Sequence, residues 1–193
     1  MAICAKISAG IAFDCDNPLV PGVDAEQLIL INRSDIDSFT LDVSNKHIVT
    51  ALTLSSASGT AAYAYEGINN SVRPLGESLT DGFTPFKFSH AVEFRIFDRT
   101  APTKEQVRNI VAGDIVAIYF RKGQTIEIMG LDTGLNNNTV TFNEYEEDSA
   151  YLMNIATDTD NGDFEPFLPR TFDTGAGFAA DKATILGLLV PAP

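Results

Sequence analysis

Few side chains in this sequence have the types and spacing that catalysis requires. The two histidines, His47 and His90, have no GxSxG elbow or other nucleophile motif beside them, so no Ser-His-Asp site is indicated. His90 is in phase with Phe88 and Val92 of an alternating stretch, which favours a core or interface position, whereas His47 is expected at a solvated hairpin tip. We therefore expect no catalytic residue.

The segment Asp158–Asp163, with the sequence DTDNGD, is the best candidate for a cation site. An EF-hand loop needs oxygen ligands at positions one, three and five, a glycine at six and a glutamate at twelve. Counted from Asp158, Gly162 falls at position five and Pro169 at position twelve, so the register fails. We expect an Asx-rich turn and no metal site.

Cys4 and Cys15 have neither CxxC spacing nor a neighbouring histidine, which favours free buried thiols, with a disulfide as the alternative. No GxGxxG or Walker loop is present, so nucleotide chemistry has no support. The chain has no tryptophan to stack a sugar, although two pairs of acids could supply the carboxylates of a glycosidase: Glu146 with Glu147, and Asp14 with Asp16. The sequence predicts neither an enzyme nor a cofactor.

The charge of the chain argues against direct nucleic-acid readout. Its 193 residues include 13 basic and 26 acidic side chains, which leaves a formal net charge of −13. Such a surface repels DNA and anionic membranes. No run of about 18 apolar residues exists, and the N-terminal apolar stretch is too short for a signal peptide. We expect a protein that is used without export and does not associate with a membrane.

The elements that would position these side chains are mostly strands. From Phe86 to Ile96 apolar and polar residues alternate, which predicts a half-buried strand with Lys87, Glu93 and Arg95 on its outer face. The apolar run Ile115–Phe120 predicts a strand buried on both faces and paired with the next strand through a tight turn. Further strands are expected at residues 27–32, 39–43, 47–54, 63–68, 71–79, 139–143 and 151–157. Those at 63–68 and 71–79 are expected to form a hairpin around Asn69 and Asn70, with Pro74 on an edge strand.

A short helix is expected after Pro102, with Thr103 and Gln106 as a capping box and Gly113 as a left-handed C-cap. A second helix is expected at Phe178–Leu189, with a strand around Thr184 and Ile185 as the alternative. Strands at this density predict a mainly β fold, an antiparallel β-sandwich or barrel. Residues 1–193 are expected to form a single domain, with an extended N-terminal arm over residues 1–26 and an irregular C-terminal tail over residues 164–193.

Three segments resemble motifs of a known group of virion proteins. They are LILINRSDID at residues 28–37, GLDTGL at residues 130–135, and the stretch at residues 149–166. These are similar to segments of the tail-barrel ring proteins of crAss-like phages, which infect gut Bacteroidales. Asp148 and Ser149 stand where that group has a glycine before Ala-Tyr.

The resemblance implies a tail-tube-like fold that assembles as a ring of six or twelve copies around a DNA channel. The partners would be further copies of the chain and neighbouring tail or portal ring proteins. DNA would pass without specific binding, and the protein would be assembled in the bacterial host cytoplasm and located in the virion tail. Rings close by heterologous contacts. We therefore expect Lys87, Glu93 and Arg95 to meet the next subunit, and the arm or the tail to pack on a neighbour.

The alternative function is a β-sandwich module that binds a glycan or a peptide. Such a module needs an exposed aromatic platform, for which the candidates are Tyr63, Tyr65, Tyr145 and Tyr151. A small hydrolase is a third hypothesis, supported by the acid pairs alone.

Overall fold

The computed structural model describes residues 23–57, 61–66, 71–79, 87–122, 124–142 and 150–189. Residues 1–22 of the expected arm lie outside these ranges. So do several residues that the sequence analysis discussed: Cys4, Asp14, Cys15, Asp16, Asn69, Asn70, Phe86, Tyr145, Glu146, Glu147, Asp148 and Ser149.

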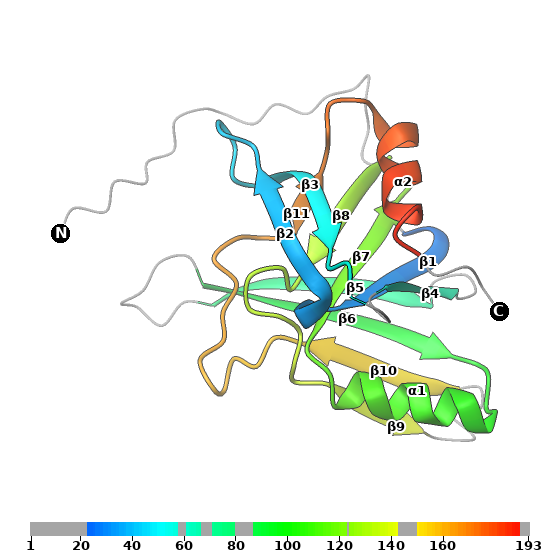
Figure 1. Ribbon diagram of the computed structural model, residues 1–193. Helices are drawn as coiled ribbons and strands as arrows, with labels where there is room; N and C mark the ends of the chain where they lie inside the picture. Colours follow the sequence, from blue (N-terminus) through cyan, green and yellow to red (C-terminus); the bar gives the residue numbers. More distant parts are fainter. Residues whose placement is uncertain are drawn as a thin grey trace.

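The described strands form two sheets (Figure 1). A seven-stranded sheet has the order β2-β3-β11-β8-β7-β1-β4, and a four-stranded sheet has the order β5-β6-β10-β9. Strands pair antiparallel except β11 with β3, which pair parallel. The elements are β1 (Val23–Asn32), η1 (Arg33–Asp35), β2 (Ile36–Leu41), β3 (Ile48–Leu54), β4 (Ala62–Glu66), β5 (Val72–Leu79), β6 (Lys87–Ile96), α1 (Ala101–Val111), β7 (Ile115–Arg121), β8 (Thr125–Met129), β9 (Thr139–Phe142), β10 (Tyr151–Ala156), β11 (Arg170–Phe172) and α2 (Phe178–Leu186).

The centre of the seven-stranded sheet is buried on both faces, as β7 shows. Its six residues Ile115–Phe120 are all buried, which confirms the expectation from the apolar run. Ala117 and Tyr119 join a core cluster that also contains β6, β10 and α1 residues. Ile118 and Phe120 join a second cluster that includes residues of β3, β11 and α2. Two cores thus flank one sheet, and each fully buried large side chain contributes about 1.5–3 kcal/mol of burial free energy.

The four-stranded sheet is buried on one face only. In β6, His90, Val92 and Phe94 are buried, while the residues between them are half-buried. This confirms the predicted alternation. β5 is an edge strand of this sheet, which agrees with the position expected from Pro74.

The two helices lie on different parts of the molecule. α1 runs beside β9 and β10 (Figure 1), and its Val107 and Ile110 enter the core between the sheets. α2 lies against β8, where its Ile185 is fully buried in the second core. Both helices were expected from the sequence. Within the described ranges, neither helix has the length and apolar character needed to cross a membrane.

The predicted hairpin from residues 63–68 and 71–79 is wrong. β4 pairs with β1 at the edge of the large sheet, whereas β5 pairs with β6 in the small one. The two segments are close in sequence and both alternate, but periodicity does not identify the partner of a strand. They instead carry the chain from one sheet to the other.

The expected irregular tail also needs correction over the part that the structure describes. Residues 170–172 form β11, which lies between β3 and β8 inside the large sheet, whereas α2 at residues 178–186 is the helix that was expected within this tail. A three-residue strand is too short to show a period of two, so its sequence gave no signal. The fold is mainly β with two sheets, as expected for a β-sandwich, and its described strands do not close a barrel.

Candidate functional site

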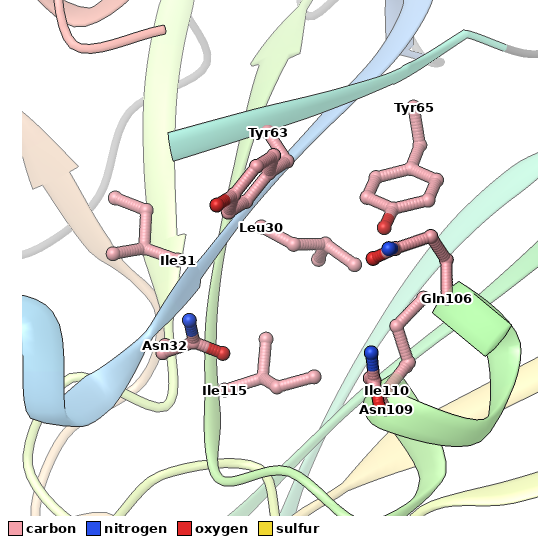
Figure 2. Close-up of a pocket in the computed structure, with 9 residues that line it drawn as sticks. All are labelled: Leu30, Ile31, Asn32, Tyr63, Tyr65, Gln106, Asn109, Ile110 and Ile115. Atoms are coloured by element: carbon pink, nitrogen blue, oxygen red, sulfur yellow. The ribbon is translucent and has the colours of Figure 1, made fainter. Parts of the chain in front are cut away.

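Uncharged polar side chains gather in a pocket beneath α1, which we call the α1 pocket (Figure 2). Its volume is about 230 Å³. Four elements supply the lining residues, which are Leu30, Ile31 and Asn32 of β1, Tyr63 and Tyr65 of β4, Gln106, Asn109 and Ile110 of α1, and Ile115 of β7.

Strand pairing places the two tyrosines on one face. In the register of β1 with β4, Leu30 lies opposite Tyr63 and Leu28 opposite Tyr65. Residues two apart in a strand share a face, so both tyrosines lie on the face of β4 that borders the pocket. In Figure 2 the Tyr65 hydroxyl points toward the Gln106 carboxamide. Burial, and then the nearby Tyr63, raises the pKa of Tyr65, so its hydroxyl keeps its proton at neutral pH.

The start of α1 differs from the predicted capping box. Thr100 is the N-cap, and the Asp98 carboxylate accepts hydrogen bonds from the hydroxyls of Thr100 and Thr103. These bonds lower the pKa of Asp98, the one from Thr103 most. Gln106 makes no capping contact of the predicted kind and lines the pocket instead.

The end of α1 also differs from the prediction, because Gly113 does not adopt a positive φ. The Asn138 side chain closes the helix instead. Its Nδ2 donates to the carbonyl oxygens of Ile110, Gly113 and Leu135 at 3.0, 2.8 and 3.1 Å. Carbonyls at a helix end need such donors. Asn138 therefore fixes the end of α1 that carries Asn109 into the pocket.

The chemistry available in the α1 pocket is binding. None of its nine lining residues is charged, and none is a histidine or a cysteine. Phenols and carboxamides donate and accept hydrogen bonds without exchanging protons near neutral pH. The apolar floor of Leu30, Ile110 and Ile115 can contact an aliphatic group. The arrangement suits an uncharged ligand that has both apolar and hydrogen-bonding parts.

A second polar group, buried in part, lies where the turn after β8 meets the segment before β11, and we call it the Arg170 cluster. It consists of Arg33, His90, Asp132, Glu165 and Arg170. Arg170 is 3% exposed, and its Nη2 lies 2.8 Å from Asp132 Oδ2. Glu165 is 2% exposed and accepts hydrogen bonds from the backbone N–H and the hydroxyl of Thr133 at 3.0 and 3.1 Å.

Backbone geometry shapes the turn that these groups hold. Gly130 and Gly134 have φ values of 73° and 89°. A Cβ at Gly134 would overlap the Asp114 carboxylate, so both conformation and space require glycine there. The Arg33 guanidinium donates to the Asp132 carbonyl and lies 3.8 Å from the Asp114 carboxylate. The GLDTGL motif is therefore a structural turn.

His90 in this cluster is a neutral side chain. Its Nδ1 accepts a hydrogen bond of 3.2 Å from the Gly130 backbone N–H. Burial lowers the pKa of His90 to about 4, against weaker opposing effects of the Phe167 carbonyl and Asp132. Burial raises the pKa of Asp132, although Arg170 opposes the shift. Because the histidine Nδ1 is already engaged, the cluster holds the turn in place and does not resemble a general-base site.

The three residues expected at a subunit contact lie on the face of β6 opposite the core. Lys87 Nζ is 4.3 Å from the centroid of the Phe164 ring, and Glu93 forms an ion pair of 3.4 Å with Arg73 of β5. Arg95 shares this face with Glu93, two residues away. The prediction placed them on one face correctly; their contact with a subunit stays a prediction.

The remaining candidates have structural surroundings. The His47 ring meets Phe167 edge-on, with 5.0 Å between ring centroids. Asp158 accepts a hydrogen bond from the Asn161 backbone N–H, so the DTDNGD segment contains the expected Asx-type turn. Among the residues that the structure describes, no three His, Cys, Asp or Glu side chains are grouped to hold a metal ion. Tyr151 lies beside Phe142, with 5.3 Å between the ring centroids.

The sequence named two of the pocket residues and missed the rest. Tyr63 and Tyr65 were candidates because exposed aromatic residues are common in binding sites. Asn32 and Asn109 carry no motif, and Gln106 had been assigned to a cap. Only the fold brings the three amides together.

The fold and the pocket define a two-sheet β protein with a neutral cavity at the edge of its large sheet. No protein-family model matches the chain, and no curated protein and no solved structure matches it.

Proposed function

We propose that this chain is a structural virion protein that forms a homo-oligomeric ring of a phage tail or connector around the DNA channel. It acts without enzymatic activity. The resemblance of its turn and strand motifs to crAss-like tail-barrel ring proteins suggests this role. The structural observation that supports it is one edge of the four-stranded sheet, which no strand of the described residues pairs with.

β9 forms this edge, and all four of its residues are exposed. In the register with β10, Val140 lies opposite Met153 and Phe142 opposite Tyr151, so both apolar side chains face inward. They are nevertheless 40% and 43% exposed, because the edge extends past the core that covers their neighbours. An exposed apolar edge strand tends to pair with another chain. If the next copy in a ring always covers this edge, the pairing becomes a specific contact.

A contact of this kind is heterologous, because the β9 edge of one copy would meet a different surface of the next. Repeated around an axis, it closes into a ring. The net charge of −13 suits a conduit, since DNA phosphates would not adhere to an acidic wall. Six or twelve copies are consistent with the resemblance.

The test compares Val140→Lys with Thr141→Lys. Both positions are exposed in β9, and each change adds one positive charge. The two side chains differ because they lie on opposite faces of the strand. Each protein is purified with its neighbouring tail or portal proteins and examined by mass photometry and negative-stain microscopy. We expect the native chain and Thr141→Lys to form rings and Val140→Lys to stay smaller. A native chain that remains monomeric and never joins a particle would overturn the proposed function.

The outer face of β6 offers a second test of the same ring. Glu93→Lys combined with Arg95→Glu keeps the net charge while reversing both sites. The control, Lys122→Glu with Asp160→Lys, makes an equal exchange at two exposed turn positions. We expect the β6 pair to weaken assembly and leave folding intact, as judged by circular dichroism. Unchanged assembly would show that this strand only builds the sheet.

A further inference from the structure

The residues that follow α2 meet the outer side of β4. The backbone N–H of Ala62 donates to the Leu188 carbonyl at 3.2 Å, and Ala62 lies opposite Leu189 in a parallel bridge. β4 is the last strand of the large sheet, and its other side pairs with β1. The chain after α2 has therefore begun to pair with the edge of this sheet.

The same hydrogen bond identifies the backbone groups that β4 leaves at its edge. Alternate residues of a strand direct their N–H and carbonyl groups to the same side. Because the Ala62 N–H points away from β1, those of Ala64 and Glu66 do as well, while Tyr63 and Tyr65 face β1. Among the residues that the structure describes, no strand pairs with the outer side of Ala64 or Glu66. Such groups are open to a further strand.

We propose that residues 190–193 of the same copy continue this pairing and add a parallel strand to the large sheet along β4. The register that begins with Ala62 and Leu189 places Pro191 opposite Ala64 and Pro193 opposite Glu66. Four extended residues span about 13 Å, which equals the length of β4 from Ala62 to Glu66. The segment is already joined to this edge through Leu188, so it reaches the whole edge without a second copy.

The sequence of residues 190–193, VPAP, suits this edge because of where its prolines fall. Ala62 bonds to Leu188, one position before its partner in the bridge, so residues 188, 190 and 192 direct their backbone groups toward β4. Val190 and Ala192 supply the N–H groups that the carbonyls of β4 need. Pro191 and Pro193, which have no N–H, take the outward positions where none is needed.

The side chains are also placed consistently. Ala62 and Leu189 both contact the second core, on the face of the sheet that α2 covers. Side chains alternate along a strand, so Val190 and Ala192 lie on the opposite face, beside Tyr63 and Tyr65. Tyr63 is 43% exposed. An aliphatic side chain next to an aromatic one on a neighbouring strand stabilises the pairing.

The added strand closes the sheet to other chains. Its outer side lacks an N–H at Pro191 and at Pro193, so a further strand finds few donors there. This removes the β4 edge from the surfaces that could pair between copies. The inference does not rest on the proposed ring, whose contact uses β9.

Hydrogen exchange at single amides, measured by mass spectrometry on the full chain, tests the pairing. We expect the Ala64 amide to be protected in the native chain. It should exchange at least about tenfold faster in Ala192→Pro, which removes the N–H that faces the Ala64 carbonyl. The amides of Tyr63 and Tyr65, which face β1, are the internal control. An Ala64 amide that exchanges freely in the native chain, or equally fast in both proteins, would overturn the inference.

A pair of threonine variants tests whether the prolines close the edge. Pro191→Thr with Pro193→Thr gives the outer side two N–H donors. Ala192→Thr is the control, because it changes a side chain without adding an outward donor. We expect sedimentation velocity to show larger species for the proline variant than for the native chain, and no change for the control. Equal size distributions for the two variants would contradict this role of the prolines.

Isotope-coded crosslinking identifies the copy that supplies the strand. A benzophenone amino acid replaces Ala192 in the full chain, and protein grown in ¹⁴N and in ¹⁵N medium is mixed in urea and refolded together. We expect crosslinks from position 192 to β4 that join chains of one isotope only. Crosslinks to β4 that pair a heavy with a light chain would show exchange of the segment between copies. Crosslinks elsewhere would overturn the pairing itself.

Discussion

The Arg170 cluster and the α1 pocket are both polar, yet they differ in charge and in exposure. In the cluster, the Arg170 guanidinium, the Glu165 carboxylate and the His90 imidazole are buried, and they contact groups of the same chain. In the pocket, phenols and carboxamides are half-open to solvent, and no charge is present. A buried charged group needs a fixed partner to offset its lost hydration. A half-exposed neutral polar group can stay hydrated until a ligand binds. We conclude that the cluster stabilises the fold and that the pocket is available to a partner.

The largest expected effect comes from Arg170→Met. This change leaves the partly buried Asp132 carboxylate without its cation, and we expect the free energy of unfolding to fall by about 3 kcal/mol. Urea denaturation monitored by circular dichroism measures it. Arg108→Met, which removes an exposed ion pair with Glu105, is the control and should change stability by less than about 1 kcal/mol. Equal losses of unfolding free energy in the two variants would show that the ion pair in the cluster contributes no more than one on the surface.

The pH dependence of stability should arise in the cluster. His90 has a pKa of about 4 in the folded protein, against 6.5 as its ordinary value. Between these values the unfolded chain binds more protons, so the contribution of His90 is complete above about pH 6.5 and is lost as the pH falls toward about 4. From about pH 7 to pH 5 we expect a loss of about 2 kcal/mol.

His90→Asn isolates this contribution. The asparagine Oδ1 can accept the bond from Gly130, but it does not titrate. The raised pKa of Asp132 acts in the opposite direction, because the folded state then binds protons more readily, and it is present in both proteins. The difference in unfolding free energy between native and variant chains should therefore shrink as the pH falls. A difference that stays constant would show that His90 is not held neutral.

Glu165→Gln should have a smaller effect. The carboxylate accepts bonds from the Asp132 and Thr133 backbone and from the Thr133 hydroxyl, and a glutamine offers one oxygen in place of two. We expect a loss of about 1 kcal/mol in a urea titration. Glu105→Gln on the exposed side of α1 is the matched control. A neutral result at both positions would mean that the turn after β8 holds its shape without Glu165.

The smallest expected effect on stability is that of Gln106→Glu in the pocket. The side chain is exposed, so the free energy of unfolding should change by less than about 0.5 kcal/mol. Urea denaturation measures the change. A clearly larger loss of stability would make the pocket a part of the fold like the cluster.

Periodicity predicted the elements better than their partners. The alternation of β6 and the apolar run of β7 were sufficient because burial of a strand face leaves a regular pattern. The pairing of β4 with β1 could not be predicted, since any alternating strand fits any edge. The sequence also could not place Arg170 beside Asp132 or Asn138 beneath α1, because single polar residues far apart in the chain carry no periodic signal.

The candidate site was predictable only in its aromatic part. Tyr63 and Tyr65 stood out because they are aromatic residues two apart in an expected strand, and of the two Tyr63 is exposed. Gln106 was assigned to a cap because its spacing from Thr103 fits one, but Thr100 is the N-cap and the Thr103 hydroxyl donates to Asp98. The Thr103–Gln106 spacing did not predict this contact, because Asp98 lies outside the motif.

The position of β11 has a consequence for synthesis of the protein on the ribosome. β2 and β3 are made early, yet the strand that joins them to β8 is made only at Arg170–Phe172. Until then the β2–β3 hairpin has no neighbour in the sheet, and Val49 and Leu52 have no completed core to enter. Pairing between such distant segments is slow, and the waiting hairpin exposes apolar surface. A ribosome that stalls before Phe172 would therefore hold a chain in two unjoined parts, open to proteolysis and to chaperones.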